Sequence, residues 1–94
     1  MKKLTKLEVN KKLKRLSGWK LVKGRNAITK SFKFNSFLSA FNWMTAIAFY
    51  SEQQNHHPEW FNVYSTVVVT LSTHDSGGVT KLDLDMAQEM NRKK

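Results

Sequence analysis

The order of hydrophobic periodicities along the chain constrains the fold more than any other feature of the sequence. A period of two residues, which is typical of strands, occurs in two pairs of segments: residues 19–23 with 27–34, and residues 60–64 with 66–73. Helical periodicity occurs in residues 3–16, 37–54 and 81–91. The order α-β-β-α-β-β-α predicts a two-layer α+β sandwich, in which a four-stranded antiparallel sheet carries about three helices on one face.

The length of the chain limits it to a single hydrophobic core. Domains usually contain about 100–200 residues, and this chain has 94, of which 40% are hydrophobic and 12% aromatic. That proportion of apolar residues is typical of a globular protein and not of a disordered one. We therefore predict one domain over residues 1–94, with a basic amphipathic helix at residues 1–16 within it.

The lack of cysteine excludes several classes of protein at once. Disulfide scaffolds, thiolate zinc sites and enzymes with a thiol nucleophile all need this residue, and the chain has none. The longest apolar stretch, residues 37–50, contains polar residues and is shorter than the ~20 residues of a membrane-spanning helix. We expect a soluble, cytoplasmic protein, with the nucleus as a second location in a eukaryotic cell.

Positive charge is concentrated at the start of the chain. Residues 1–33 hold 12 of the 16 lysines and arginines and a single acid, Glu8, so that this third carries a net charge of +11. Such a segment is typical of proteins that contact a polyanion. We favour instead an ordinary amphipathic helix with solvated lysines, because the segment lacks the interleaved aromatics of single-strand binders. Its apolar stripe would comprise Leu4, Leu7, Val9, Leu13 and Leu16. A nucleic-acid partner is not expected.

The middle of the chain is expected to supply most of the core. In the strand at residues 27–34, the face with Ile28, Phe32 and Phe34 is expected to be buried, apart from Lys30.

Ser36 is expected to cap the following helix, at residues 37–54. Trp43 and Tyr50 lie off the predicted apolar stripe of that helix and widen its apolar surface. A subunit interface or a covered pocket would explain this width, although core packing is the commoner cause. The stripe comprises Phe37, Ala40, Phe41, Met44, Ile47 and Ala48.

The last helix begins with a recognisable capping pattern. Thr80 is expected to be its N-cap, and Asp83 follows at the third helical position, as in a capping box. Val79 and Leu84 flank the pair as a hydrophobic staple would. Asp83 therefore has a structural role available on local grounds alone.

Three histidines are the strongest candidates for chemistry. His56 and His57 lie at the corner before Pro58, which ends the preceding helix. If the two strands that follow form a hairpin, the chain returns His74 to that corner. Imidazoles titrate near pH 6.5, so such a cluster beside carboxylates suits proton transfer at neutral pH. The alternative is that these residues only cap a helix and end a strand. A metal site is not expected, because adjacent histidines rarely point the same way and no zinc spacing occurs.

Four carboxylates lie close enough in the sequence to support the histidines. Glu52 lies one helical turn before His56. Asp83 could orient His74, or serve only in the capping box. Glu59 and Asp75 are expected to be mainly solvated corner residues.

These residues together resemble one known family, the pterin-4a-carbinolamine dehydratases, also described as dimerisation cofactors of a homeodomain transcription factor. The resemblance rests on the motif Glu52-x-x-x-His56-His57-Pro58-Glu59-Trp60-Phe61-Asn62-Val63-Tyr64, then Thr70-Leu71-Ser72-Thr73-His74, and Asp83. Weaker similarity extends it over roughly residues 16–88, which leaves the lysine-rich helix without a counterpart.

The resemblance implies a 4a-hydroxytetrahydrobiopterin dehydratase, which converts 4a-hydroxytetrahydropterin to quinonoid dihydropterin and so recycles the pterin used by aromatic amino-acid hydroxylases. It implies no metal and no organic cofactor. By position, His56, His57 and His74 match the three active-site histidines of the family, and Glu52 and Asp83 match the acids that support them.

We predict that His57 is the principal acid–base group, that Asp83 holds His74 as its partner, and that His56 positions the ring. Glu52 and Trp60 are expected to help His56 bind the substrate, although plain core packing is the commoner role for such a tryptophan. The expected partners are the pterin, further copies of the chain in a dimer or tetramer, and a transcription factor. The alternative function is that of a non-catalytic interaction protein, either a transcription-factor dimerisation cofactor or a polyanion-binding module.

Overall fold

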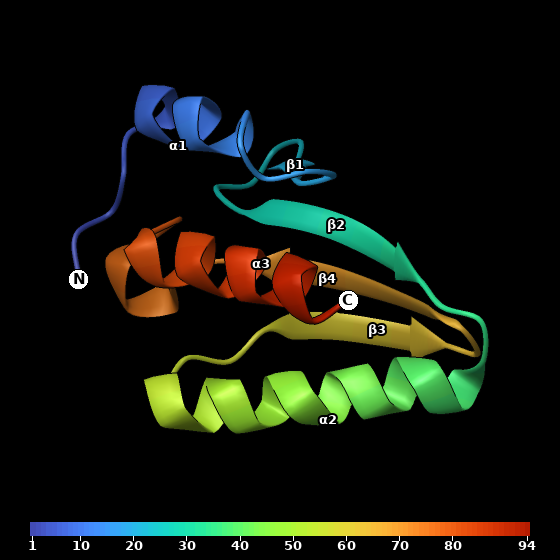
Figure 1. The fold of residues 1–94 in the computed structure, drawn as a ribbon. Coiled ribbons are helices and arrows are strands. Elements are labelled where there is room, and N and C mark those ends of the chain that lie inside the picture. Colours follow the sequence, from blue (N-terminus) through green and yellow to red (C-terminus); the bar gives the residue numbers. More distant parts are fainter.

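The computed structural model describes all 94 residues and has three α-helices against a four-stranded antiparallel sheet of order β1-β2-β4-β3 (Figure 1). Along the chain the elements are α1 (Lys6–Leu13), β1 (Lys20–Leu21), β2 (Ile28–Lys33), α2 (Phe37–Gln54), β3 (Glu59–Val63), β4 (Thr66–Leu71), the 3₁₀ turn η1 (His74–Ser76) and α3 (Lys81–Lys93). The predicted α+β class and element order are confirmed. No helix is both long and apolar enough to cross a membrane.

Pairing between β2 and β4 joins the two hairpins into one sheet. Ile28 is opposite Leu71, and Phe32 is opposite Val67, so that the large buried side chains of both strands fall on the same face. β3 pairs with the other side of β4 and forms the edge of the sheet. The face predicted for β2 is confirmed, and β4 buries Val67, Val69 and Leu71 on the same side, because strand residues alternate between the two faces of a sheet.

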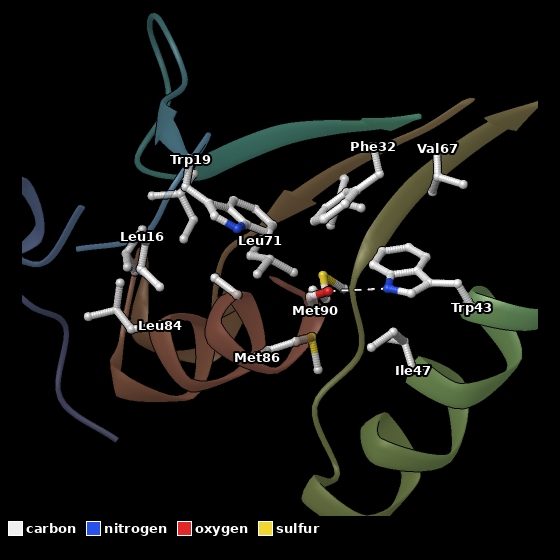
Figure 2. Packing of buried hydrophobic residues seen from close by; sticks show 14 of the residues in the cluster. Leu16, Trp19, Phe32, Trp43, Ile47, Val67, Leu71, Leu84, Met86 and Met90 are labelled. Carbon is white, nitrogen blue, oxygen red and sulfur yellow. Dashed lines mark hydrogen bonds between the residues drawn. The ribbon is translucent and has the colours of Figure 1, made fainter. Parts of the chain in front are cut away.

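The core lies between this face of the sheet and the helices (Figure 2). It contains 16 buried residues, with contributions from all three helical segments and from the sheet. The Nε1 atom of Trp43 in α2 donates a hydrogen bond to the carbonyl oxygen of Met90 in α3, at 3.2 Å. The ring of Trp43 also packs on that of Phe32, with centroids 4.5 Å apart. Each large side chain buried here contributes about 1.5–3 kcal/mol relative to an exposed one.

α2 faces the sheet with a stripe that matches the predicted one only in part: Ala40 and Ile47 are buried as predicted, and Met44 packs against the core. Trp43, which was expected to lie off the stripe, is only 5% exposed, whereas Phe37 and Phe41 are 49% and 51% exposed. The buried residues of this helix are Ala40, Trp43, Ile47 and Ser51. Apolar residues surround much of the helix, so the hydrophobic pattern alone did not determine its rotation. The indole of Trp43 decides it, because its ring fills the core while its N–H group reaches a carbonyl acceptor.

The helix starts follow their capping residues. Ser36 caps α2 by accepting a hydrogen bond from the Ser39 amide at 3.0 Å, as predicted. α1 is shorter than residues 3–16, because Thr5 caps it and forms a capping box with Glu8. Leu7 of its predicted apolar stripe is 79% exposed. α1 is therefore held to the core by fewer side chains than expected.

Candidate active site

The end of α2 sends two adjacent histidines in different directions. The helix ends at Asn55, whose left-handed backbone (φ 50°) turns the chain, and the His56 amide donates to the carbonyl oxygen of Ser51 at 3.1 Å. His56 is then buried, at 8% exposed, whereas the side chain of His57 is 56% exposed. As predicted, the two adjacent histidines do not point the same way.

Asp83 is the buried anchor of the site. It has no exposed surface, and its Oδ1 atom lies 2.6 Å from Nε2 of His56. Its Oδ2 atom accepts hydrogen bonds from the Thr73 hydroxyl at 2.8 Å and from the Thr80 amide at 2.9 Å. The predicted capping box is therefore confirmed, and the same carboxylate also holds a histidine.

The partner of Asp83 differs from the prediction. We expected Asp83 to hold His74, whereas the structure pairs it with His56. The difference arises from burial. Asp83 lies in the first turn of α3 on the core side, and His56 points to the same side. His74, in contrast, begins the exposed turn η1. The His74 side chain is 86% exposed.

The two exposed histidines face carboxylates at the surface. Nε2 of His57 lies 2.5 Å from Oε2 of Glu52, which occupies the last turn of α2. Nε2 of His74 lies 3.9 Å from Oε2 of Glu59 at the start of β3. Each histidine of the chain therefore has its own carboxylate.

Glu59 is more than a solvated corner residue. Both of its oxygens accept hydrogen bonds from the guanidinium of Arg25, one of them at 2.8 Å. These hydrogen bonds lower the pKa of Glu59 below its ordinary value and raise that of Arg25. The carboxylate that faces His74 is thus kept ionised and fixed in orientation.

A cleft brings the three histidines together. It has a volume of about 370 Å³, which is within the range of small-molecule sites. Its lining includes His56, His57 and His74, together with Ser72 and Thr73. The predicted return of His74 to the corner is therefore confirmed. Each histidine can carry or accept a proton, so the cleft can move protons at several points around one bound ring.

Trp60 does not reach this cleft. Its side chain is half-buried against the core, and its ring centroid lies 6.3 Å from that of Trp43. Asp83 and Glu52 also stay outside the lining, and they act on it only through His56 and His57. No group of three histidine, aspartate or glutamate side chains lies close enough together to hold a metal ion.

Comparison with known proteins adds the deciding observation. The family model described as pterin 4 alpha carbinolamine dehydratase matches residues 2–93. The chain belongs to this family.

Similar proteins cover nearly the whole length of this dehydratase-family chain. Relatives from Brucella ovis and Brucella abortus, provisionally named pterin-4-alpha-carbinolamine dehydratase, are 54% identical over 88 residues, which is 94% of this chain and 91% of theirs. A crystal structure of a transcriptional coactivator/pterin dehydratase from Brucella melitensis aligns with a TM-score of 0.95 at 53% identity and covers 97% of both chains. The match therefore extends beyond residues 16–88 and includes α1.

Within this member of the dehydratase family, sequence reasoning missed Arg25. The residue lies in the turn between β1 and β2, 34 positions from Glu59. Its only local signal is the turn sequence Gly24-Arg25-Asn26, which predicts the shape of the chain but no partner. Arg25 reaches Glu59 because β2, β4 and β3 lie side by side, with Thr29, Thr70 and Glu59 in register.

Proposed function

We propose that this protein is a pterin-4a-carbinolamine dehydratase, which removes water from 4a-hydroxytetrahydropterin to give quinonoid dihydropterin. The observation that carries the proposal is the cleft in which three histidines meet, each with its own carboxylate. Membership of the dehydratase family supports the same reaction.

The reaction needs an acid and a base about one ring apart. The bond between C4a and its hydroxyl oxygen breaks, the oxygen takes up a proton and leaves as water, and a ring nitrogen loses its proton as the C=N bond forms. A positioned side chain that transfers one of these protons contributes about 10²–10⁴-fold to the rate. Histidines at both sides of a cleft can supply both transfers.

We assign the roles by exposure and contacts. His57 is the principal acid–base group, because it lines the cleft and its Nε2 atom contacts the carboxylate of Glu52. His74 is its partner across the cleft, with Glu59 beside it in the place that we had expected Asp83 to take. His56 positions the ring, because Asp83 fixes its imidazole from the core.

The test is the rate of quinonoid dihydropterin formation from freshly generated 4a-hydroxytetrahydropterin, above the spontaneous reaction. We expect acceleration by the wild-type protein and by Lys14→Ala, an exposed charge away from the cleft. We expect His57→Ala to lose most of it while its circular dichroism spectrum is unchanged. No acceleration by the folded wild-type protein would refute the function, and normal turnover by His57→Ala would refute its role.

An oligomer is part of the proposal. The outer face of α2 exposes four large apolar side chains, Phe37, Leu38, Phe41 and Phe49, each about half exposed or more. Several large apolar side chains exposed on one helix are typical of an interface, and a dimer or tetramer of the chain would cover them. Analytical ultracentrifugation of the wild type and of Phe41→Glu/Phe49→Glu tests this, since a monomer in both cases would contradict it.

A second function is that of an interaction protein that binds a transcription factor. It is favoured by the similarity to a Brucella melitensis protein described as a transcriptional coactivator as well as a pterin dehydratase. The same apolar face of α2 would then serve a different partner. Absence of dehydratase activity together with a stable folded oligomer would make this function the leading one.

A further inference from the structure

A second cavity lies apart from the histidine cleft, between α1 and the turn that joins β1 to β2. Its volume is about 750 Å³, which is twice that of the cleft and well within the range of small-molecule sites. Four basic residues line it, Lys6 from α1 and Lys20, Lys23 and Arg25 from the hairpin. We call this cavity the basic groove. Figure 1 shows α1 lying beside β1, with this part of the hairpin facing it.

The lysines of the basic groove have no acidic partner in the protein. Lys6, Lys20 and Lys23 are all exposed, and every ion pair of the chain involves other residues. The one acid among residues 1–33 is Glu8, whose Oε1 atom accepts a hydrogen bond from the Thr5 amide at 2.8 Å. The groove thus gathers three positive charges that nothing in the fold neutralises.

The turn between β1 and β2 forms part of the rim of the groove. The backbone amides of residues 23–26 donate to no other backbone group, and Gly24 adopts a left-handed conformation with φ 78°. Turns with successive free amides suit anions. Arg25 differs from the lysines, because its guanidinium already donates two hydrogen bonds to Glu59, whose negative charge offsets its own.

Part of the remaining wall of the basic groove is aliphatic, and Asn26 and Thr29 add polar side chains to it. Val9, Leu21 and Val22 line it, and no aromatic side chain does. Proteins that bind single-stranded nucleic acid stack the bases on aromatic rings, so this groove lacks what that partner needs. A compact ligand that carries several negative charges on a partly apolar body fits both walls.

We propose that the basic groove is a binding site for a small molecule with a diphosphate or triphosphate group. Lysine ammonium groups are compact point charges that bind phosphate oxygens without a fixed geometry. Three such charges match the negative charge of a di- or triphosphate, and the concave shape favours a small molecule over a long polymer. The basic groove shares no lining residue with the histidine cleft, and Arg25 is the one groove residue that reaches the cleft, through Glu59 beside His74.

The experiment measures binding by isothermal titration calorimetry, with inorganic pyrophosphate, adenosine diphosphate and a short DNA duplex as probes. Lys20→Gln/Lys23→Gln removes two charges from the groove. Lys14→Gln/Lys33→Gln removes the same number from the same basic third of the chain, at exposed positions outside the groove. Circular dichroism confirms that each variant is folded. The measurement uses neither pterin nor turnover. A negative result would therefore refute the phosphate site without bearing on the dehydratase proposal.

We expect pyrophosphate and adenosine diphosphate to bind the wild-type protein. The groove variant should lose about tenfold or more in affinity, as expected when charge-assisted hydrogen bonds are removed, and the control variant less than about twofold. Tighter binding of adenosine diphosphate than of pyrophosphate would show that the aliphatic wall contributes. Equal losses in the two variants, preference for the duplex, or no binding of either phosphate would each overturn the proposal.

Discussion

The inner and outer sides of the histidine cleft are held by the fold in different ways. On the inner side, His56 is 8% exposed and bonded to a carboxylate, that of Asp83, with no exposed surface. On the outer side, the side chains of His57 and His74 are 56% and 86% exposed, and both face carboxylates at the surface. The inner side is continuous with the core, whereas the outer side is open to solvent.

This difference teaches how one small domain can combine rigidity with proton transfer. A buried polar group must have hydrogen-bond partners, because its desolvation is otherwise uncompensated. Asp83 therefore has three, and they tie the end of α2 to the start of α3. Exposed ion pairs contribute little to stability, so the fold depends much less on His57 and His74 than on His56.

The largest effect should come from removing the inner anchor. Asp83→Ala leaves His56, the Thr73 hydroxyl and the Thr80 amide without their acceptor in a buried place. We expect a loss of about 3–5 kcal/mol in the free energy of unfolding, measured with urea. Asp85→Ala, on the same helix but at a partly exposed ion pair, is the control and should cost far less. Equal losses in the two variants would contradict the anchor role.

The next largest effect is expected from comparing His56, on the inner side of the cleft, with His57, on the outer side. His56→Ala leaves the carboxylate of Asp83 buried without its histidine and should lower stability by about 2–4 kcal/mol. His57→Ala should change stability by less than about 0.5 kcal/mol, yet lower turnover by about 10²–10⁴-fold. Denaturation and kinetics on the same two variants separate the effects. If His56→Ala proved as stable as His57→Ala, the distinction between inner and outer sides would be wrong.

A smaller effect on turnover is expected from substitution of Glu52, whose carboxylate contacts His57. Glu52→Gln keeps the size of the side chain and removes the charge that lies 2.5 Å from the imidazole. Because an exposed ion pair contributes about 0.2–1 kcal/mol, turnover should fall by less than about tenfold, with stability unchanged. Steady-state kinetics of this variant measures it, and a loss as large as that of His57→Ala would mean that Glu52 itself transfers a proton.

The smallest effect concerns the Arg25–Glu59 pair. The hydrogen bonds from Arg25 hold the pKa of Glu59 below its ordinary value of 4.5. A carboxylate with a lowered pKa stabilises the fold above its unfolded pKa, and this contribution is lost as the pH falls through the folded pKa. Arg25→Gln should therefore be less stable than the wild type by no more than about 1 kcal/mol at neutral pH.

That difference should disappear as the pH falls through the lowered pKa of Glu59, because the carboxyl group is then protonated in both proteins. Urea denaturation of Arg25→Gln and wild type across the pH range provides the measurement. A difference that persists unchanged in acid would show that Arg25 stabilises the fold through packing and not through charge.

Much of the fold was predictable because its signals are local. Ser36 caps α2, Pro58 follows its end, and the capping box of Thr80 and Asp83 starts α3, as expected from residues within a few positions of one another. The burial of Ile28 and Phe32 also followed from alternation along a single strand.

The errors arose where two distant segments had to be placed against each other. Trp43 was expected to lie off the apolar stripe of α2 and is instead in the core, because packing on Phe32 and Met90 sets the rotation of the helix. Asp83 was assigned to His74 and pairs with His56, which is 27 positions away. Trp60 was expected to help bind the substrate and packs beside Trp43.

By itself, the sequence determined the order of the helices and strands, the caps that begin the helices, and the three histidines that carry the resemblance to the dehydratase family. These features depend on spacing over a few residues, which the chain specifies directly. Only the tertiary structure decided which carboxylate serves which histidine, and it brought Arg25 to Glu59. Those contacts depend on the register of β2, β4 and β3 and on the rotation of α2, which packing of the whole core selects.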